Sequence, residues 1–189
     1  MRSTFSVLFA VLLIVGLISG FYTNLATSSD EIDSQWRNTY TVILARADLA
    51  KKLAKILEDN KFPHKDLIKD LRESSNKVAG SDDKAKVRLE NFQLENAIDS
   101  VFLVIDAYPK IKDNADYMVV SKDLVEAGRN IDVVRKEYNE AVQSHNFKVK
   151  FYPYAFFADL LGLKEKEYFR GVERSRFIPK EIYEKKPES

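Results

Sequence analysis

The first pattern in the chain is an uninterrupted apolar run close to its N-terminus. Residues 4–29 carry no charged side chain, and residues 5–21 are almost wholly apolar. A helix needs about 20 such residues to cross the hydrocarbon core of a bilayer. The run therefore predicts a transmembrane anchor over residues 1–29, with Tyr22 as an interfacial residue at its outer end. A cleaved signal peptide, with Arg2 as its basic region, is the alternative.

The basic residues around this run favour one orientation. Arg2 and the α-amino group precede the run, and the next basic residue is Arg37. Because basic residues are retained on the cytoplasmic side, the N-terminus is expected in the cytoplasm and the bulk of the chain outside it. A cytoplasmic bulk is the alternative. We therefore expect a single-pass protein of the cell membrane.

Beyond the anchor, apolar residues recur at alternating spacings of three and four, which is typical of helices that pack together. The first helix continues from the anchor without a Gly or Pro and ends near Asn60. Its seam consists of Trp36, Tyr40, Ile43, Ala47, Ala50, Ala54 and Leu57. A short second helix includes Leu67 to Val78 and ends at Gly80, and Ser81 or Asp82 is expected to cap the third.

Two longer helices complete the pattern. The third contains an all-apolar stretch from Val101 to Ile105, which predicts deep burial, and ends at Pro109. The fourth is expected from about Asp116 to Lys150. Its seam is the most regular: Val120, Leu124, Ala127, Ile131, Val134, Tyr138, Ala141 and His145. The fold class is all-α, with a transmembrane helix followed by an antiparallel up-down four-helix bundle; a three-helix bundle is the alternative.

An aromatic cluster follows the fourth helix. It consists of Phe151, Tyr152, Tyr154, Phe156 and Phe157. Such a cluster either covers the open end of a bundle or lies at the membrane interface. In a four-helix order the last helix returns toward the bilayer, so these residues are candidate membrane-proximal aromatics.

The remaining residues carry charges of both signs. The predicted organisation is an anchor at 1–29, a helical bundle at 30–163 and a charged, partly disordered C-terminal tail at 164–189. Within this tail Phe169, Phe177 and Ile178 are candidate docking residues.

Composition narrows the function classes. The 189 residues have a formal net charge of +1, so no basic field exists to attract nucleic acid, and no nucleic-acid partner is expected. Cysteine is absent, which excludes disulfides, Cys-ligated metals and thiol catalysis. The chain has two histidines, His64 in a linker and His145 on a helix seam, without the Glu-x-x-His pattern of di-metal bundles. We expect no cofactor, no metal and no catalytic residues.

Polar residues on the fourth helix form the one candidate ligand or partner strip. The polar strip consists of Arg135, Asn139, His145 and Asn146. Hydrogen bonds that set helix register inside the bundle are the first interpretation of these positions. A polar pocket for a ligand is the alternative, and it requires that the strip face a void.

Several short motifs together resemble the LemA family of bacterial membrane proteins. They are Ala45-Arg46-Ala47-Asp48-Leu49, then Ala107-Tyr108-Pro109-Lys110-Ile111-Lys112, then Tyr138-Asn139-Glu140-Ala141-Val142 with His145-Asn146, and finally Phe151, Pro153, Ala158 and Gly162. The resemblance covers about residues 34–169 and implies a helical bundle on one membrane helix, without an established activity or cofactor. The chain departs from the family pattern at Ala47, at Ala50 to Lys52, and at His145, which replaces a Tyr. Descriptions of the family often place the short N-terminus outside, opposite to the charge argument.

We therefore predict a non-enzymatic, membrane-anchored helical bundle that scaffolds or recruits partners at the membrane. The lipid bilayer is the first expected partner, and the protein partners are unknown. Self-association through Gly16, Ser19 and Gly20 of the anchor is a further expectation. A ligand-sensing domain, or an auxiliary subunit of a membrane enzyme, is the alternative function.

Overall fold

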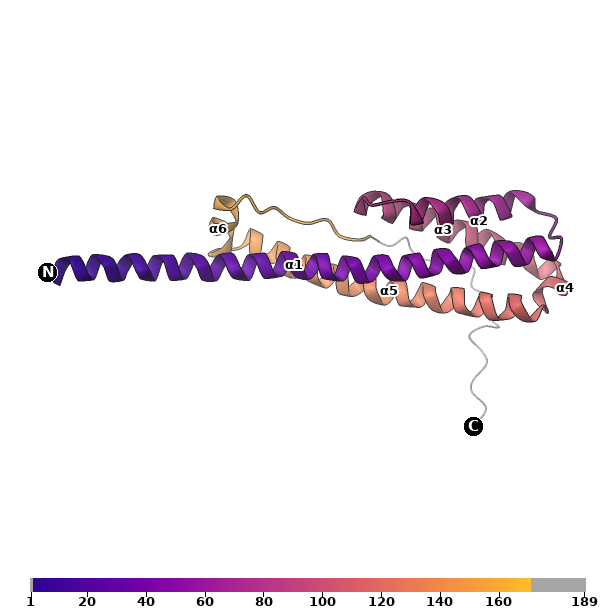
Figure 1. Ribbon diagram of the computed structural model, residues 1–189, viewed down its shortest axis with the longest axis horizontal. Helices are drawn as coiled ribbons and strands as arrows, with labels where there is room; N and C mark the ends of the chain where they lie inside the picture. The colour runs from indigo at the N-terminus through magenta and orange to yellow at the C-terminus, as the bar shows by residue number, and fades with distance from the viewer. Residues whose placement is uncertain (1, 171–189) are drawn as a thin grey trace, which may run out of the picture. The chain divides into compact units, whose positions relative to one another are not determined.

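The computed structural model describes residues 2–170, and throughout this part of the chain the regular secondary structure is helical (Figure 1). The elements in chain order are α1 (Arg2–Asp59), α2 (Lys65–Ala79), α3 (Lys84–Val104), the 3₁₀ turn η1 (Ile105–Ala107), α4 (Pro109–Lys112), α5 (Ala115–Lys150) and α6 (Tyr154–Leu160). The all-α fold class is confirmed. Phe177 and Ile178 lie outside the described residues.

Helix α1 contains the predicted anchor and continues beyond it without a break, as the absence of Gly and Pro after Gly20 predicts. Among the described residues, α1 is the one helix long and apolar enough to cross a membrane. Its apolar side chains from Phe5 to Ile18 are exposed, Leu12 by 61%. Exposure of an apolar surface this large is unfavourable in water and favourable in lipid. Within residues 2–170, α1 is therefore the candidate membrane-spanning helix.

The described residues form two compact units. The first combines residues 2–38 with residues 135–169, and the second consists of residues 39–134 together with residue 170.

In the second unit, the end of α1 contacts three other helices. Glu58 pairs with Arg72 of α2, and the Tyr40 hydroxyl donates to the Ser81 carbonyl at 3.1 Å, so α1 and α2 run antiparallel. Arg46 lies 3.9 Å from Glu95 of α3, and the Thr39 hydroxyl donates to the Val134 carbonyl of α5 at 3.3 Å. These contacts join four helical segments, while the complete up-down topology stays a prediction.

The seam predicted for the fourth helix is confirmed along its whole length. All eight members of the seam, from Val120 to His145, are at most 8% exposed. Helix α5 also begins one residue before the expected Asp116 and ends at the expected Lys150. A regular spacing of three and four residues is therefore sufficient to identify the buried face of this helix.

Two local predictions for the third helix are wrong. Asp83, rather than Ser81 or Asp82, caps α3, because its carboxylate accepts the Lys86 amide at 2.8 Å. The all-apolar stretch is not buried all round, since Leu103 is 58% exposed. The third helix ends before Pro109, and Pro109 itself begins α4. Proline is favoured in a first helical turn, because the backbone N–H that it lacks would have no partner within the helix there.

In the first unit, α1 and α5 lie antiparallel. Phe21 of α1 contacts Phe157 of α6, while Trp36 of α1 contacts Tyr138 of α5. The chain thus returns along α1 toward the end of the apolar span. Tyr154 and Phe157 of the aromatic cluster form part of the short helix α6 in this unit.

Candidate functional site

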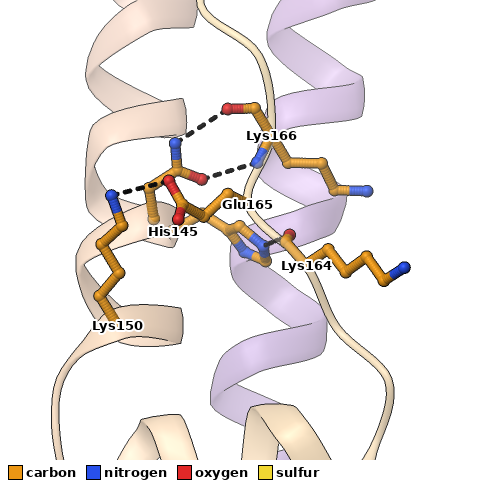
Figure 2. A network of polar contacts seen from close by, with 6 residues as sticks. His145, Lys150, Lys164, Glu165 and Lys166 are labelled. Atoms are coloured by element: carbon orange, nitrogen blue, oxygen red, sulfur yellow. Dashed lines mark hydrogen bonds and ion pairs between the residues drawn. The ribbon is translucent and has the colours of Figure 1, made fainter.

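The polar strip on α5 holds an extended segment of the same chain. Residues Lys164–Phe169, which we call the strap, have no regular secondary structure and run beside α5 (Figure 2 shows the part from Lys164 to Lys166). Asn146 Nδ2 donates to the Lys166 carbonyl at 2.8 Å, and the Lys166 amide donates to Asn146 Oδ1 at 2.7 Å. Asn139 repeats both bonds with Phe169, at 2.9 and 2.7 Å. Each side-chain amide therefore binds both main-chain polar groups of one strap residue.

The spacing of the two asparagines matches the spacing of the residues they bind. Seven residues of α-helix rise by about 10.5 Å. Three residues of extended chain span about 10 Å. Asn139 and Asn146 therefore stay in register with Phe169 and Lys166, and the strap runs antiparallel to α5. Between them, the Tyr138 hydroxyl donates to the Glu167 carbonyl at 3.2 Å.

The strap ends in an aromatic contact. The Phe169 ring is 3% exposed and lies 6.2 Å from Trp36, measured between ring centroids. Tyr138 approaches Trp36 edge-on at 5.7 Å. The other strap residues, Lys164 to Tyr168, are exposed. The strap is thus bound through its main chain and through one buried aromatic side chain.

His145 lies where α1, α5 and the strap meet. Its Nδ1 is 2.9 Å from Ser28 Oγ of α1. Its Nε2 is 3.2 Å from the Lys164 carbonyl (Figure 2). Nε2 faces a carbonyl oxygen and is therefore the donor to Lys164, while the Ser28 hydroxyl beside Nδ1 donates to the Leu25 carbonyl at 2.8 Å. Both ring nitrogens of this fully buried side chain therefore have a hydrogen-bonding neighbour.

The surroundings of His145 disfavour its charged form. Burial is the main cause that lowers the pKa of His145 below its ordinary value, while the hydrogen bond to the Lys164 carbonyl acts in the opposite direction. The ammonium groups of Lys166 and Lys148 lower this pKa further. At the edge of the site, Lys150 Nζ pairs with Glu165 Oε2 at 2.8 Å, and this contact raises the pKa of Lys150. The ammonium groups of Lys148, Lys150 and Lys166 thus lie around this end of the strip, and Glu165 pairs with that of Lys150.

Three of the four predicted strip residues, Asn139, His145 and Asn146, meet at the strap. Arg135 lies half-buried one helical turn before Asn139. A ligand pocket required a void, and along these three residues the strap fills the space instead. Sequence reasoning missed Ser28 and the strap as members of the site. The Tyr-Asn and His-Asn pairs seven residues apart were the available signal for a repeated contact.

The aromatic cluster has two distinct sides. Phe157 stacks on Phe21 with ring centroids 4.3 Å apart, and Tyr154 approaches Phe21 edge-on at 4.9 Å. On the other side Tyr152 and Phe156 are 88% and 64% exposed. Phe151 stacks on Phe147 of α5, and both rings remain more than half exposed. Phe156 lies edge-on to Phe157 with ring centroids 5.4 Å apart, so an exposed ring adjoins the ring that stacks on Phe21.

The second histidine, His64 in the linker between α1 and α2, makes a specific contact with a distant residue. His64 Nε2 lies 2.9 Å from the Tyr108 hydroxyl, and both rings pack with Phe62. His64 is half-buried, and Tyr108 belongs to the Ala-Tyr-Pro motif before α4. This cluster gives the linker between α1 and α2 a structural contact with the turn between α3 and α4.

Other polar features of the second unit do not assemble reactive groups. A cleft of about 850 Å³ lies between the end of α1 and α2 and is crossed by the exposed ion pair of Glu58 and Arg72. Glu90 Oε2 and Asn91 Oδ1 are buried without a hydrogen-bond partner among the described residues, a setting that suits ordered water. Within residues 2–170, no group of three or more His, Asp or Glu side chains could hold a metal ion.

Taken together, one apolar span and a helical region with an internally bound strap define a single-pass, all-α membrane protein. The LemA family model matches residues 35–180, which is most of the chain. The protein therefore belongs to the LemA family.

Two curated relatives show a more limited similarity. They are the magnetosome proteins MamQ 1 and MamQ 2 of Paramagnetospirillum magneticum, each 31% identical over 75 residues. The match covers 40% of this chain and 28% of each relative. The chain thus spans less than a third of these relatives' length.

Proposed function

We propose that this protein is a non-enzymatic, membrane-anchored helical protein that recruits partner proteins to the membrane surface. The observation that carries the proposal is the stacking of Phe157 on Phe21. It joins α6 to the end of the apolar span, so one unit carries the anchor, an aromatic surface next to the bilayer and the end of a long helix. Such an arrangement holds a rigid helical surface close to the membrane, which is what recruitment requires.

The aromatic cluster is proposed to lie in the membrane interface. Tyr and Phe are favoured at the level of the lipid headgroups, where their rings contact both apolar and polar surroundings. Exposure of the Tyr152 and Phe156 rings is unfavourable in water and favourable in the membrane interface. The bilayer is thus the first partner, and protein partners bind farther from it.

The bulk of the chain is proposed to be extracytoplasmic, from the positions of Arg2 and Arg37 on either side of the span. Orientation is measured by placing one cysteine at Asp82, which is exposed between α2 and α3, in this cysteine-free chain. Labelling by a membrane-impermeant maleimide in intact cells is expected. Labelling only after lysis would place the bulk in the cytoplasm.

Recruitment is tested through the membrane fraction of other proteins. Cells that lack this chain are complemented with the full chain or with Leu12→Lys, which places a charge in the span at a cost of about 3 kcal/mol. Quantitative proteomics then compares membrane and soluble fractions. We expect a defined set of proteins to leave the membrane fraction in both the deletion and the Leu12→Lys cells. If no protein changes its fraction, the recruiting role is wrong.

A further inference from the structure

The surface of α1 and α5 that holds the strap, which we call the groove, binds an extended segment of chain. Its polar contacts are directed at main-chain atoms, which every peptide possesses. Asn146 and Asn139 each bind the N–H and the carbonyl of one residue, at positions that are three residues apart in the strap. Such paired bonds select an extended conformation and a register, and they are independent of side-chain identity.

Two further contacts do depend on side chains. The Phe169 ring is buried against Trp36, and the Glu165 carboxylate pairs with Lys150. Between them, Lys166, Glu167 and Tyr168 leave their side chains exposed. The strap therefore presents an acidic residue to Lys150 and, four positions later, a large aromatic residue to Trp36, with an extended main chain between them.

The strap is held through main-chain hydrogen bonds and one buried ring, and it carries little buried apolar surface. Only one of its six residues is buried, and it has no regular secondary structure. Segments with few buried apolar contacts open locally at a small free-energy cost compared with the whole fold. When the strap opens, the amides of Asn139 and Asn146 lose their partners and become available to another chain.

We infer that this groove is a binding site for an extended peptide segment of a partner protein, with the pattern acidic-x-x-x-aromatic, and that the strap is its intramolecular occupant. The segment binds antiparallel to α5, with its aromatic side chain against Trp36. Because the strap competes for the groove, the apparent affinity of the peptide equals its intrinsic affinity multiplied by the fraction of molecules in which the groove is open. The existence of a biological partner rests on the proposed recruiting role. Binding of a synthetic peptide is measured independently of that role.

The test uses the full chain in detergent or nanodiscs and a fluorescent synthetic peptide with the sequence of residues 164–170. The strap is released by combining Lys166→Pro, which removes the N–H bound by Asn146, with Phe169→Ala, which removes the aromatic contact. Release is verified by trypsin cleavage at Lys164, and the fold by circular dichroism. We expect the peptide to bind this variant at least tenfold more tightly than it binds the unmodified chain.

Matched controls test the proposed contacts. Adding Asn139→Ala and Asn146→Ala to the released variant is expected to weaken peptide binding at least tenfold, while Gln143→Ala, an exposed position on α5, leaves it unchanged. Peptides with Phe169→Ala or Glu165→Lys are expected to bind more weakly. Failure of the peptide to bind the released variant, or equal binding after loss of both asparagines, would overturn the inference.

A second copy of this chain is the other occupant that the experiment distinguishes. One copy carries Lys150→Cys and the other Glu165→Cys, so that a short bismaleimide joins them only when the strap of one occupies the groove of the other. We expect no such cross-linked dimer, whereas one chain with both substitutions cross-links internally. A dimer that disappears with Asn139→Ala and Asn146→Ala would assign the groove to a second copy and overturn the partner assignment.

Discussion

Asn146 holds Lys166 by both of its main-chain polar groups, through bonds of 2.8 and 2.7 Å, although the two residues are 20 positions apart in the sequence. Asn139 holds Phe169 in the same way. Removal of either amide should therefore free the strap.

Asn139→Ala and Asn146→Ala are each expected to increase cleavage by trypsin after Lys164 and Lys166. Each loses two hydrogen bonds in a partly exposed setting, which amounts to about 1–2 kcal/mol of local stability. Hydrogen exchange of the Lys166 and Phe169 amides is expected to accelerate about tenfold. Gln143→Ala is the control, and equal cleavage of all three variants would contradict the assigned role of the asparagines.

Phe169→Ala is expected to change the environment of Trp36, the one tryptophan of the chain. Without the Phe169 ring, water reaches the indole, so its emission shifts to longer wavelength and acrylamide quenches it more strongly. The free energy of unfolding is expected to fall by at most about 3 kcal/mol, because the strap can detach without opening the rest of the fold. Tyr168→Ala, at an exposed neighbour, serves as the control; an unchanged spectrum in Phe169→Ala would refute the contact.

Acidification is expected to weaken the junction at His145. Its pKa is lowered in the folded protein, so the unfolded or released state binds more protons as the pH falls below the ordinary value of about 6.5. Stability is therefore fully present above that pH and is lost as the pH falls toward the folded-state pKa. Strap cleavage between pH 7.5 and pH 5.5 measures the effect.

His145→Gln is the matched variant, because an amide retains donor and acceptor capacity without titrating in this range. Its strap cleavage, corrected for the intrinsic pH dependence of the protease, is expected to stay constant over the same range. Identical pH profiles of the two proteins would show that another group is responsible.

Phe156 is expected to lie in the membrane interface. A fluorescent label on Phe156→Cys should be quenched by lipids that carry a quencher near the headgroup. A label on Glu137→Cys should not be quenched. Glu137 is exposed and adjoins Tyr138, which contacts Trp36 of α1. Trp36 lies 15 residues beyond Phe21, or about 22 Å along α1. Equal quenching at both sites would remove the argument for a membrane-proximal cluster.

Tyr108→Phe is expected to destabilise the second unit by about 1 kcal/mol. The variant keeps the ring contacts with Phe62 and removes the hydroxyl that lies 2.9 Å from His64 Nε2. Urea unfolding measures the difference, with Tyr152→Phe, at an 88% exposed ring, as the control. A change no larger than that of the control would show that the hydrogen bond is dispensable.

The sequence alone was sufficient for the features that depend on local pattern. The apolar run, the continuous α1, the buried seam of α5 from Val120 to His145 and the helix end at Gly80 all follow from side-chain spacing or backbone preference. The membrane helix and the family relationship were also recognisable, because both consist of residue patterns along the chain. The orientation across the membrane and the recruiting role stay predictions.

Only the tertiary structure decided what the polar strip contacts. Asn139 and Asn146 pair with residues that follow 20 to 30 positions later, and the strap has no periodicity of its own, so no local pattern predicts the contact. The same reason applies to Ser28 with His145 and to His64 with Tyr108, since each pair joins distant segments. Hydrogen bonds between main chain and side chain depend on position in space, and that position is a property of the packed helices.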